Sequence, residues 1–160
     1  MDPLTHEMKQ LVDQERLGFF ATVCPDGSPN LSPKGTLMVW DDAHLMFADI
    51  HSPGTVANLA LNPTIEVNVV DPFARKGFRF KGTATVLEEG RIFDEAVQRY
   101  RARGVHYPIH HIVLIRVQLA IPVVSPVYDT DISEDEVRGI WEEHHRTARP
   151  HGRAPGAPPA

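Results

Sequence analysis

Six short segments with the residue pattern of β-strands follow one another along this chain, and most of them are joined by turns. The clearest is residues 76–89, where Phe78 and Phe80 alternate with Arg79 and Lys81, as they do when one face of a strand is buried. Pro25-Asp26-Gly27 marks a hairpin between the first two segments. The six lie at residues 17–24, 28–40, 43–49, 64–71, 76–89 and 110–126. This succession predicts a mainly β fold, an antiparallel β-barrel with peripheral helices.

Four segments carry helical signals. Asp2-Pro3 is a helix start, Ser52-Pro53 is a second, and residues 91–103 form an amphipathic pattern that ends at Gly104. Ser133 with Glu136 three residues later is a capping box for the last helix. Residues 1–146 are therefore predicted to form one domain. Residues 147–160 are rich in Pro, Gly and Ala and are predicted to be a disordered tail.

Composition limits the possible functions of the chain. The net charge of −5 argues against a nucleic-acid surface, and no apolar run approaches the roughly 20 residues that cross a membrane. A polar N-terminus and the single cysteine, Cys24, favour a cytoplasmic protein. The pairs His110-His111 and His144-His145 diverge on a strand and on a helix, so neither pair is expected to share a metal ion.

The stretch "NLSPKGT", Asn30 to Thr36, interrupts its strand. Pro33 removes a ladder hydrogen bond and Gly35 weakens pairing. If the backbone leaves the sheet here, the N–H groups of Lys34, Gly35 and Thr36 become free for a polar ligand. Ser32 lies on the same side as Lys34. The alternative is a bulge or barrel bend at Gly35 with no ligand.

The stretch "HSPGTVAN" places small polar residues at a helix N-terminus, where free N–H groups favour a phosphate. Ser52, Gly54 and Thr55 offer contacts there, and Asn58 lies one turn further on. The alternative is N-capping by Ser52 alone.

The stretch "GFRFKGTA" projects two cations, Arg79 and Lys81, from one strand face. The missing side chain of Gly82 would allow a flat ring to approach the backbone closely. The alternative is a solvated face with extended, water-exposed side chains.

In order and spacing, "GSPNLSPKGT", "LMFADIHSPGTVANLALNPTIEVNVVD" and "GFRFKGTATV" resemble the flavin-binding split-barrel family, which includes pyridoxamine 5′-phosphate oxidases and small FMN-binding proteins. The resemblance covers about residues 5–130 and implies a six-stranded antiparallel split β-barrel. It also implies a homodimer that binds FMN at the subunit interface. The implied cofactor-binding residues are Ser32, Pro33, Lys34, Gly35, Thr36, Phe47, Ala48, Asp49, Ser52, Gly54, Thr55, Asn58, Arg79, Lys81 and Gly82.

Within that set, the resemblance implies that Ser32 to Thr36 lie along the isoalloxazine ring and that Ser52 to Asn58 hold the phosphate. Many members place an Arg-Lys, His-Lys or Lys-Thr pair at the phosphate, whereas this chain has Pro53-Gly54-Thr55, of which only Thr55 matches. Lys34, Arg79 or an arginine of the partner chain is then expected to supply the charge.

The implied activity is that of an FMN-dependent oxidoreductase acting on an unidentified small molecule. Lys81 or Arg79 near the pyrimidine edge would stabilise the negative charge of the reduced flavin. The alternatives are a non-catalytic FMN-binding or electron-carrier protein and a deazaflavin-binding member of the same fold. A haem-binding member, with an axial histidine such as His106 or His110, is the third. The absorption spectrum of the purified protein discriminates between the cofactors.

Overall fold

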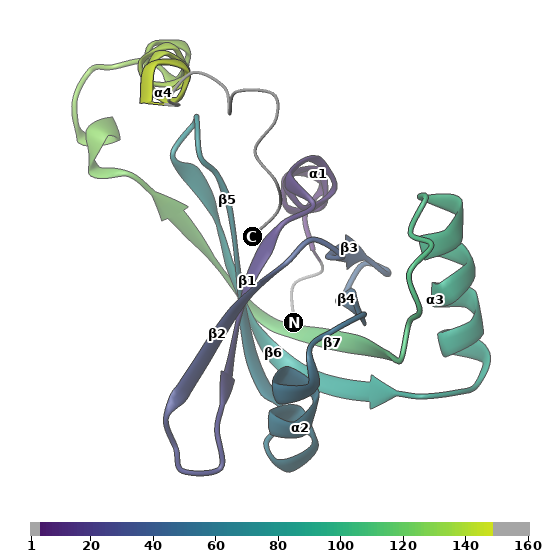
Figure 1. The fold of residues 1–160 in the computed structure, drawn as a ribbon. Coiled ribbons are helices and arrows are strands. Elements are labelled where there is room, and N and C mark those ends of the chain that lie inside the picture. Colours follow the sequence, from purple (N-terminus) through teal and green to yellow (C-terminus); the bar gives the residue numbers. More distant parts are fainter. Residues whose placement is uncertain (1–3, 149–160) are drawn as a thin grey trace, which may run out of the picture. The chain divides into compact units, whose positions relative to one another are not determined.

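The computed structural model describes residues 4–148, and within them the chain forms one seven-stranded sheet with four α-helices (Figure 1). The strands are β1 (Gly18–Val23), β2 (Pro29–Lys34), β3 (Met38–Val39), β4 (His44–Asp49), β5 (Thr64–Asp71), β6 (Lys76–Leu87) and β7 (His111–Val124). The helices are α1 (His6–Glu15), α2 (Pro53–Leu61), α3 (Arg91–Ala102) and α4 (Glu134–Ala148), with a 3₁₀ turn at Pro126–Asp129. The mainly β, antiparallel split-barrel prediction is confirmed.

The strand count exceeds the prediction by one because "NLSPKGT" divides its strand. β2 ends at Lys34, a turn at Gly35 and Thr36 follows, and β3 begins at Met38. The strand order is β2-β1-β5-β6-β7-β4-β3, so the two halves of this segment form the two edges of the sheet. The chain therefore crosses from one edge to the other at Gly35, and the expected departure from the sheet is confirmed.

Alternation along the strands separates a buried inner face from an outer face. Phe20, Phe47 and Phe80 are fully buried on the inner face, and the rings of Phe20 and Phe47 meet edge to face at 4.7 Å between centroids. A second cluster forms where Tyr100 of α3 packs with Met46 and Ile112. Burial of about 150–250 Å² per aromatic ring makes these contacts a large part of the core energy.

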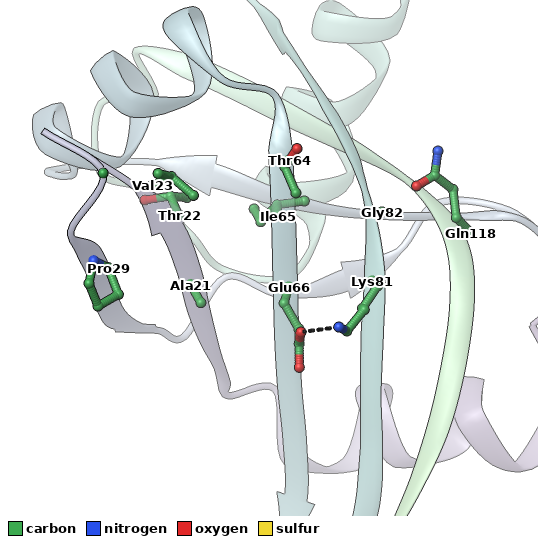
Figure 2. Close-up of a pocket in the computed structure, with 11 residues that line it drawn as sticks. Ala21, Thr22, Val23, Pro29, Thr64, Ile65, Glu66, Lys81, Gly82 and Gln118 are labelled. Atoms are coloured by element: carbon green, nitrogen blue, oxygen red, sulfur yellow. Dashed lines mark ion pairs between the residues drawn. The ribbon is translucent and has the colours of Figure 1, made fainter. Parts of the chain in front are cut away.

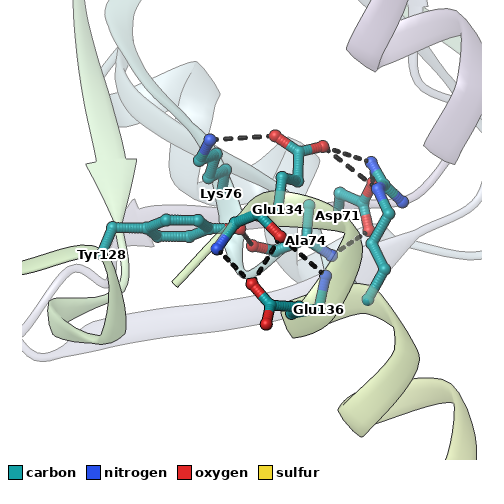
Figure 3. A network of polar contacts seen from close by, with 8 residues as sticks. Asp71, Ala74, Lys76, Tyr128, Glu134 and Glu136 are labelled. Carbon is teal, nitrogen blue, oxygen red and sulfur yellow. Dashed lines mark hydrogen bonds and ion pairs between the residues drawn. The ribbon is translucent and has the colours of Figure 1, made fainter. Parts of the chain in front are cut away.

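Residues 71–76 and 124–148 form a separate compact unit that contains the tip of the β5–β6 hairpin and α4. Figure 3 shows its polar network: Lys76 pairs with Glu134 at 2.9 Å, and the Tyr128 hydroxyl donates to the carbonyl of Ala74. Arg138 donates to Asp71 at 2.7 Å. Burial opposes ionisation of Asp71, but hydrogen bonds from Ala74 and Arg138 hold its pKa below the ordinary value.

The helix ends agree with the sequence signals in part. The Ser133–Glu136 capping box is confirmed, since the Glu136 N–H donates to the Ser133 hydroxyl and the Glu136 carboxylate accepts from the Ser133 N–H. α1 begins at His6 with Thr5 as its cap, while the predicted start at Asp2-Pro3 lies outside the described residues. α4 runs through Ala148, so Thr147 is helical, and residues 149–160 of the predicted tail lie outside the described range.

Candidate functional site

A buried lysine and three hydroxyl groups meet where β2 passes the start of α2. Lys34 Nζ donates to Ser52 Oγ at 2.8 Å, Ser32 Oγ at 2.9 Å and Thr55 Oγ1 at 3.1 Å. Lys34 is only 7% exposed. We call Ser32, Lys34, Ser52 and Thr55 the Lys34 cluster. The structure thus brings together the first two sequence motifs through their polar side chains.

The strand register explains why Lys34 is buried. Ser32 pairs with Phe20 and Lys34 pairs with Gly18, so both side chains lie on the inner face. The ammonium lies 5.2 Å from the ring centre of Phe47 and 5.9 Å from that of Phe20. Burial lowers the pKa of Lys34, and the Asp49 carboxylate opposes this change. A cation whose hydrogen bonds go only to hydroxyl groups in such surroundings is suited to an anionic ligand.

The N-terminus of α2 is open toward a ligand. Ser52 makes no side-chain capping bond, because its hydroxyl accepts from Lys34 instead. Interpretation of Ser52 as a plain N-cap is therefore wrong. Pro53 has no N–H, and no protein acceptor within residues 4–148 binds the N–H of Gly54 or Thr55. A Cβ at Gly54 would meet no atom within 4 Å, so this turn is also sterically accessible.

The backbone N–H groups of Gly35 and Thr36 are free donors beside the Lys34 cluster. Neither N–H has a protein acceptor within the described part of the chain, as the strand break predicts. Gly35 is exposed, and nothing lies within 4 Å of its would-be Cβ. The Thr36 side chain is engaged differently: its hydroxyl donates to the Ala48 carbonyl at 2.9 Å and accepts from the Ala48 N–H at 3.2 Å. Pro33 is exposed on the outer side of β2.

The end of β4 contacts the Lys34 cluster through the side chain of Asp49. Phe47 is part of the core, and Asp49 is buried at 4% exposure. One Asp49 oxygen accepts from the Ser52 N–H at 2.7 Å, and the other lies 2.8 Å from His111 Nδ1. Asp49 therefore fixes the backbone at the start of α2. Sequence patterns do not indicate the role of His111, because the Asp49–His111 contact depends on the β4–β7 register.

The structure does not bring Asn58 into the cluster. Its Nδ2 donates to Thr22 Oγ1 at 3.0 Å and lies 3.6 Å from Cys24 Sγ. Asn58 thus joins α2 to β1 one turn beyond Thr55. Its geometry is that of a buried residue whose side chain supports the fold.

Arg79 and Lys81 lie on the outer face, away from the Lys34 cluster. Both pair with Glu66 of the neighbouring strand, at 2.5 Å from Arg79 Nε and 3.4 Å from Lys81 Nζ. The hydrogen bond from Arg79 lowers the pKa of Glu66 and raises that of Arg79. Glu66 and Lys81 line an open pocket of about 410 Å³ on this face, together with Gln118 and Ala21 (Figure 2). Sequence patterns missed Glu66 because its partners depend on the β5–β6 pairing.

Gly82 has a structural reason in the pairing of β6 with β7. A Cβ at this position would lie 2.2 Å from the carbonyl oxygen of Arg116. Since β7 occupies that space, the glycine allows close contact between the two strands. Gly82 also lines the open pocket beside Lys81, and its contact with a flat ring stays a prediction.

Metal clusters and membrane-spanning helices would each indicate a different function. No group of three or more His, Cys, Asp or Glu side chains within residues 4–148 is placed to hold a metal ion. Among the helices of the described range, none is long and apolar enough to cross a membrane.

Comparisons with known proteins agree with this geometry. The model of the family described as pyridoxamine 5′-phosphate oxidase matches residues 4–119. A search of curated protein sequences finds no match. Among solved structures, HupZ from Group A Streptococcus is 31% identical over 76% of this chain and 94% of that one, with a TM-score of 0.69.

Two further structures share the fold at lower identity. An FMN-binding protein from Syntrophomonas wolfei is 19% identical over 76% of this chain and 87% of that one, with a TM-score of 0.64. The haem storage protein HutZ from Vibrio cholerae is 19% identical over 76% and 94%, with a TM-score of 0.59. At this identity the likeness concerns the fold alone. The family match over residues 4–119 covers most of the sequence, and the chain belongs to the pyridoxamine 5′-phosphate oxidase family.

Proposed function

We propose that this protein binds FMN and acts as a flavin-dependent oxidoreductase on a small molecule in the cytoplasm. The observation that carries the proposal is the buried Lys34 ammonium, held by three hydroxyl groups at the open N-terminus of α2. A cation, hydroxyl donors and free N–H groups together form the donor set that a phosphate requires. FMN is the flavin whose phosphate this set would hold.

Lys34 supplies the charge that the α2 sequence lacks. Pro53-Gly54-Thr55 stands where many family members place a pair with at least one basic residue, and this helix has no basic residue in its last turn either. The Lys34 ammonium approaches the same helix turn from β2. Ser52 and Thr55 reach it from the helix, so a phosphate bound there would replace hydroxyl contacts that are already aligned.

The turn after Lys34 is the proposed contact for the flavin ring. The free N–H groups of Gly35 and Thr36 are donors of the kind that bind the polar edge of a heterocycle. When bound, FMN supplies the electron and hydride transfer chemistry, and the protein orients it. Arg79 and Lys81 would add positive potential on the other face of the sheet, partly offset by Glu66.

We further propose that the protein is a homodimer with flavin at the interface. Phe19 is 44% exposed and Leu31 is 65% exposed, and both lie on the outer face of the β1–β2 hairpin beside Pro33. Exposed apolar strand surface of this kind favours a second copy. Because the Lys34 cluster and the two outer cations lie on opposite faces, one flavin could contact both groups only with the help of a partner subunit.

The absorption spectrum of the purified protein, before and after addition of FMN, tests the cofactor. We expect flavin bands that shift on binding and a stoichiometry of one FMN per chain. A haem band, or a deazaflavin spectrum without FMN binding, would contradict the proposal. Rapid reduction or reoxidation of bound FMN in the presence of a substrate, relative to free FMN, would separate an oxidoreductase from a non-catalytic carrier.

A further inference from the structure

A second pocket adjoins the Lys34 cluster at the start of α2. Its volume is about 440 Å³, within the range of about 300–1,000 Å³ that small-molecule sites occupy. Ile50, Pro53, Val56 and Ala57 give it an apolar lining. Ser52 lines it too, so the same residue contacts both Lys34 and this pocket.

The fixed polar group of this pocket is His111. Its Nδ1 lies 2.8 Å from Asp49 Oδ2, and the Asp49 side chain is only 5% exposed. Because the buried carboxylate engages Nδ1, Nε2 is the ring nitrogen available for proton exchange. Nε2 lies 3.4 Å from Glu88 Oε1, and the Glu88 side chain is 76% exposed.

Asp49 links this histidine to the cofactor cluster. Its other oxygen accepts from the Ser52 N–H at 2.7 Å, and its charge opposes the lowering of the pKa of Lys34. The charged groups that face His111 are thus Asp49 from β4 and Glu88 after β6, with His51 and His110 on the same pocket wall. His51 and His110 are more exposed than His111.

We propose that this pocket binds a small, largely apolar phenol or enol, and that His111 exchanges a proton with its hydroxyl group through Nε2. In one direction the O–H bond breaks, the proton forms an Nε2–H bond, and the oxygen keeps the electron pair. The resulting imidazolium is stabilised by Asp49, which acts as a positioning residue. The reverse step returns the proton to the oxygen, and no electrons are gained or lost.

The proposal rests on the proposed function in one respect: the pocket is the substrate site of the flavin bound at the Lys34 cluster. Binding and proton exchange nevertheless require no flavin. A test on the purified full-length chain without added FMN can therefore fail or succeed independently of the cofactor proposal, which the FMN titration tests separately.

The probe is 4-nitrophenol, whose visible absorption reports the ionised fraction of its hydroxyl group. We expect the wild-type protein to bind it and to raise the ionised fraction at a pH where the free probe is half ionised. His111→Gln should weaken binding by about tenfold and abolish this rise. Asp49→Asn, which keeps an acceptor for the Ser52 N–H, should reduce the rise while retaining binding. His106→Gln changes an exposed histidine outside the pocket and should match the wild type.

A second measurement covers the case in which a variant fails to fold. In wild-type protein labelled with ¹⁵N-histidine, addition of 4-nitrophenol should shift the His111 ring nitrogens more than those of His106. Equal spectra and affinities for wild type and His111→Gln, or no shift at His111, would overturn the proposal. So would haem in the purified protein whose absorption band is lost in His111→Gln, since His111 would then be an iron ligand.

Discussion

Two lysines of the same sheet have opposite surroundings. Lys34 lies on the inner face at 7% exposure and donates to three hydroxyl groups. Lys81 lies on the outer face, where its side chain is 48% exposed and shares Glu66 with Arg79. Salt bridges at such exposed positions contribute about 0–1 kcal/mol. A cation becomes a binding group where it is desolvated and where no carboxylate neutralises it directly, and only Lys34 of the two meets both conditions.

The largest expected effect follows from removing the Lys34 charge. Lys34→Met keeps an apolar stem beside Phe20 and Phe47 but loses a hydrogen bond to a phosphate, at about 1.5–3 kcal/mol. FMN affinity should therefore fall by about 10- to 150-fold. Fluorescence titration of FMN checks this, with Lys81→Met as the matched control, which should change affinity by no more than about twofold. Equal losses of FMN affinity in the two variants would contradict the distinction between Lys34 and Lys81.

The second-largest expected effect distinguishes the roles of Thr55 and Asn58 on α2. Thr55→Ala removes a cluster hydroxyl and should weaken FMN binding by about tenfold, with a smaller loss for riboflavin, which has no phosphate. Asn58→Ala leaves the buried Thr22 hydroxyl without its partner and should lower the free energy of unfolding by about 1–3 kcal/mol.

Chemical denaturation and flavin titrations of both variants check this pair. Asn58→Ala should change FMN and riboflavin affinity equally. A loss confined to FMN in Asn58→Ala would show that Asn58 contacts the phosphate, contrary to its position in the structure.

A smaller effect follows from the pKa of Lys34, which burial lowers from the ordinary 10.5. As pH rises through the lowered value the ammonium loses its charge, so FMN affinity should decline by several-fold below pH 10.5, while that of riboflavin declines less. Over the same window the unfolded state binds more protons than the folded state, so Lys34 makes stability rise with pH. Titrations at several pH values, repeated in Lys34→Met, should show the FMN-specific decline only in the wild type.

The outer cations should give the smallest effect. Lys81→Met or Arg79→Met removes positive charge from the outer face, and the midpoint potential of bound flavin should fall by no more than about 30 mV, or 1.4 kcal/mol for two electrons. Glu66→Gln should raise the potential, because both cations lose their counter-charge. Potentiometry measures all three. Shifts below about 10 mV throughout would make these residues surface charges with no role in flavin chemistry.

Local signals in the sequence predicted the elements that position the site. Pro33 and Gly35 predicted the break between β2 and β3, and Ser52-Pro53 predicted the start of α2, because these residues act on their own backbone. The contacts of the side chains depended on long-range pairing. The Ser52 hydroxyl turns to Lys34 only because β2 passes α2, which the capping pattern of α2 alone does not contain.

The contacts that the sequence did not predict have the same origin. The Arg116 carbonyl lies against Gly82 because β7 neighbours β6, and the sequence of β6 alone does not contain this contact. Arg79 and Lys81 share Glu66 only because β5 neighbours β6 in the sheet. The pairing of Asp49 with His111 at the end of the β4–β7 ladder likewise appears only once the register is known.

The central claim is that the Lys34 cluster recognises the phosphate of FMN. Calorimetric titration of the wild-type protein with FMN and with riboflavin tests it most directly, because the two flavins share the ring and differ in the phosphate. The account predicts that FMN binds at least about 100-fold more tightly than riboflavin, equivalent to about 2.7 kcal/mol for a charged group with several donors. Equal affinity for the two flavins, or no binding of either, would contradict it.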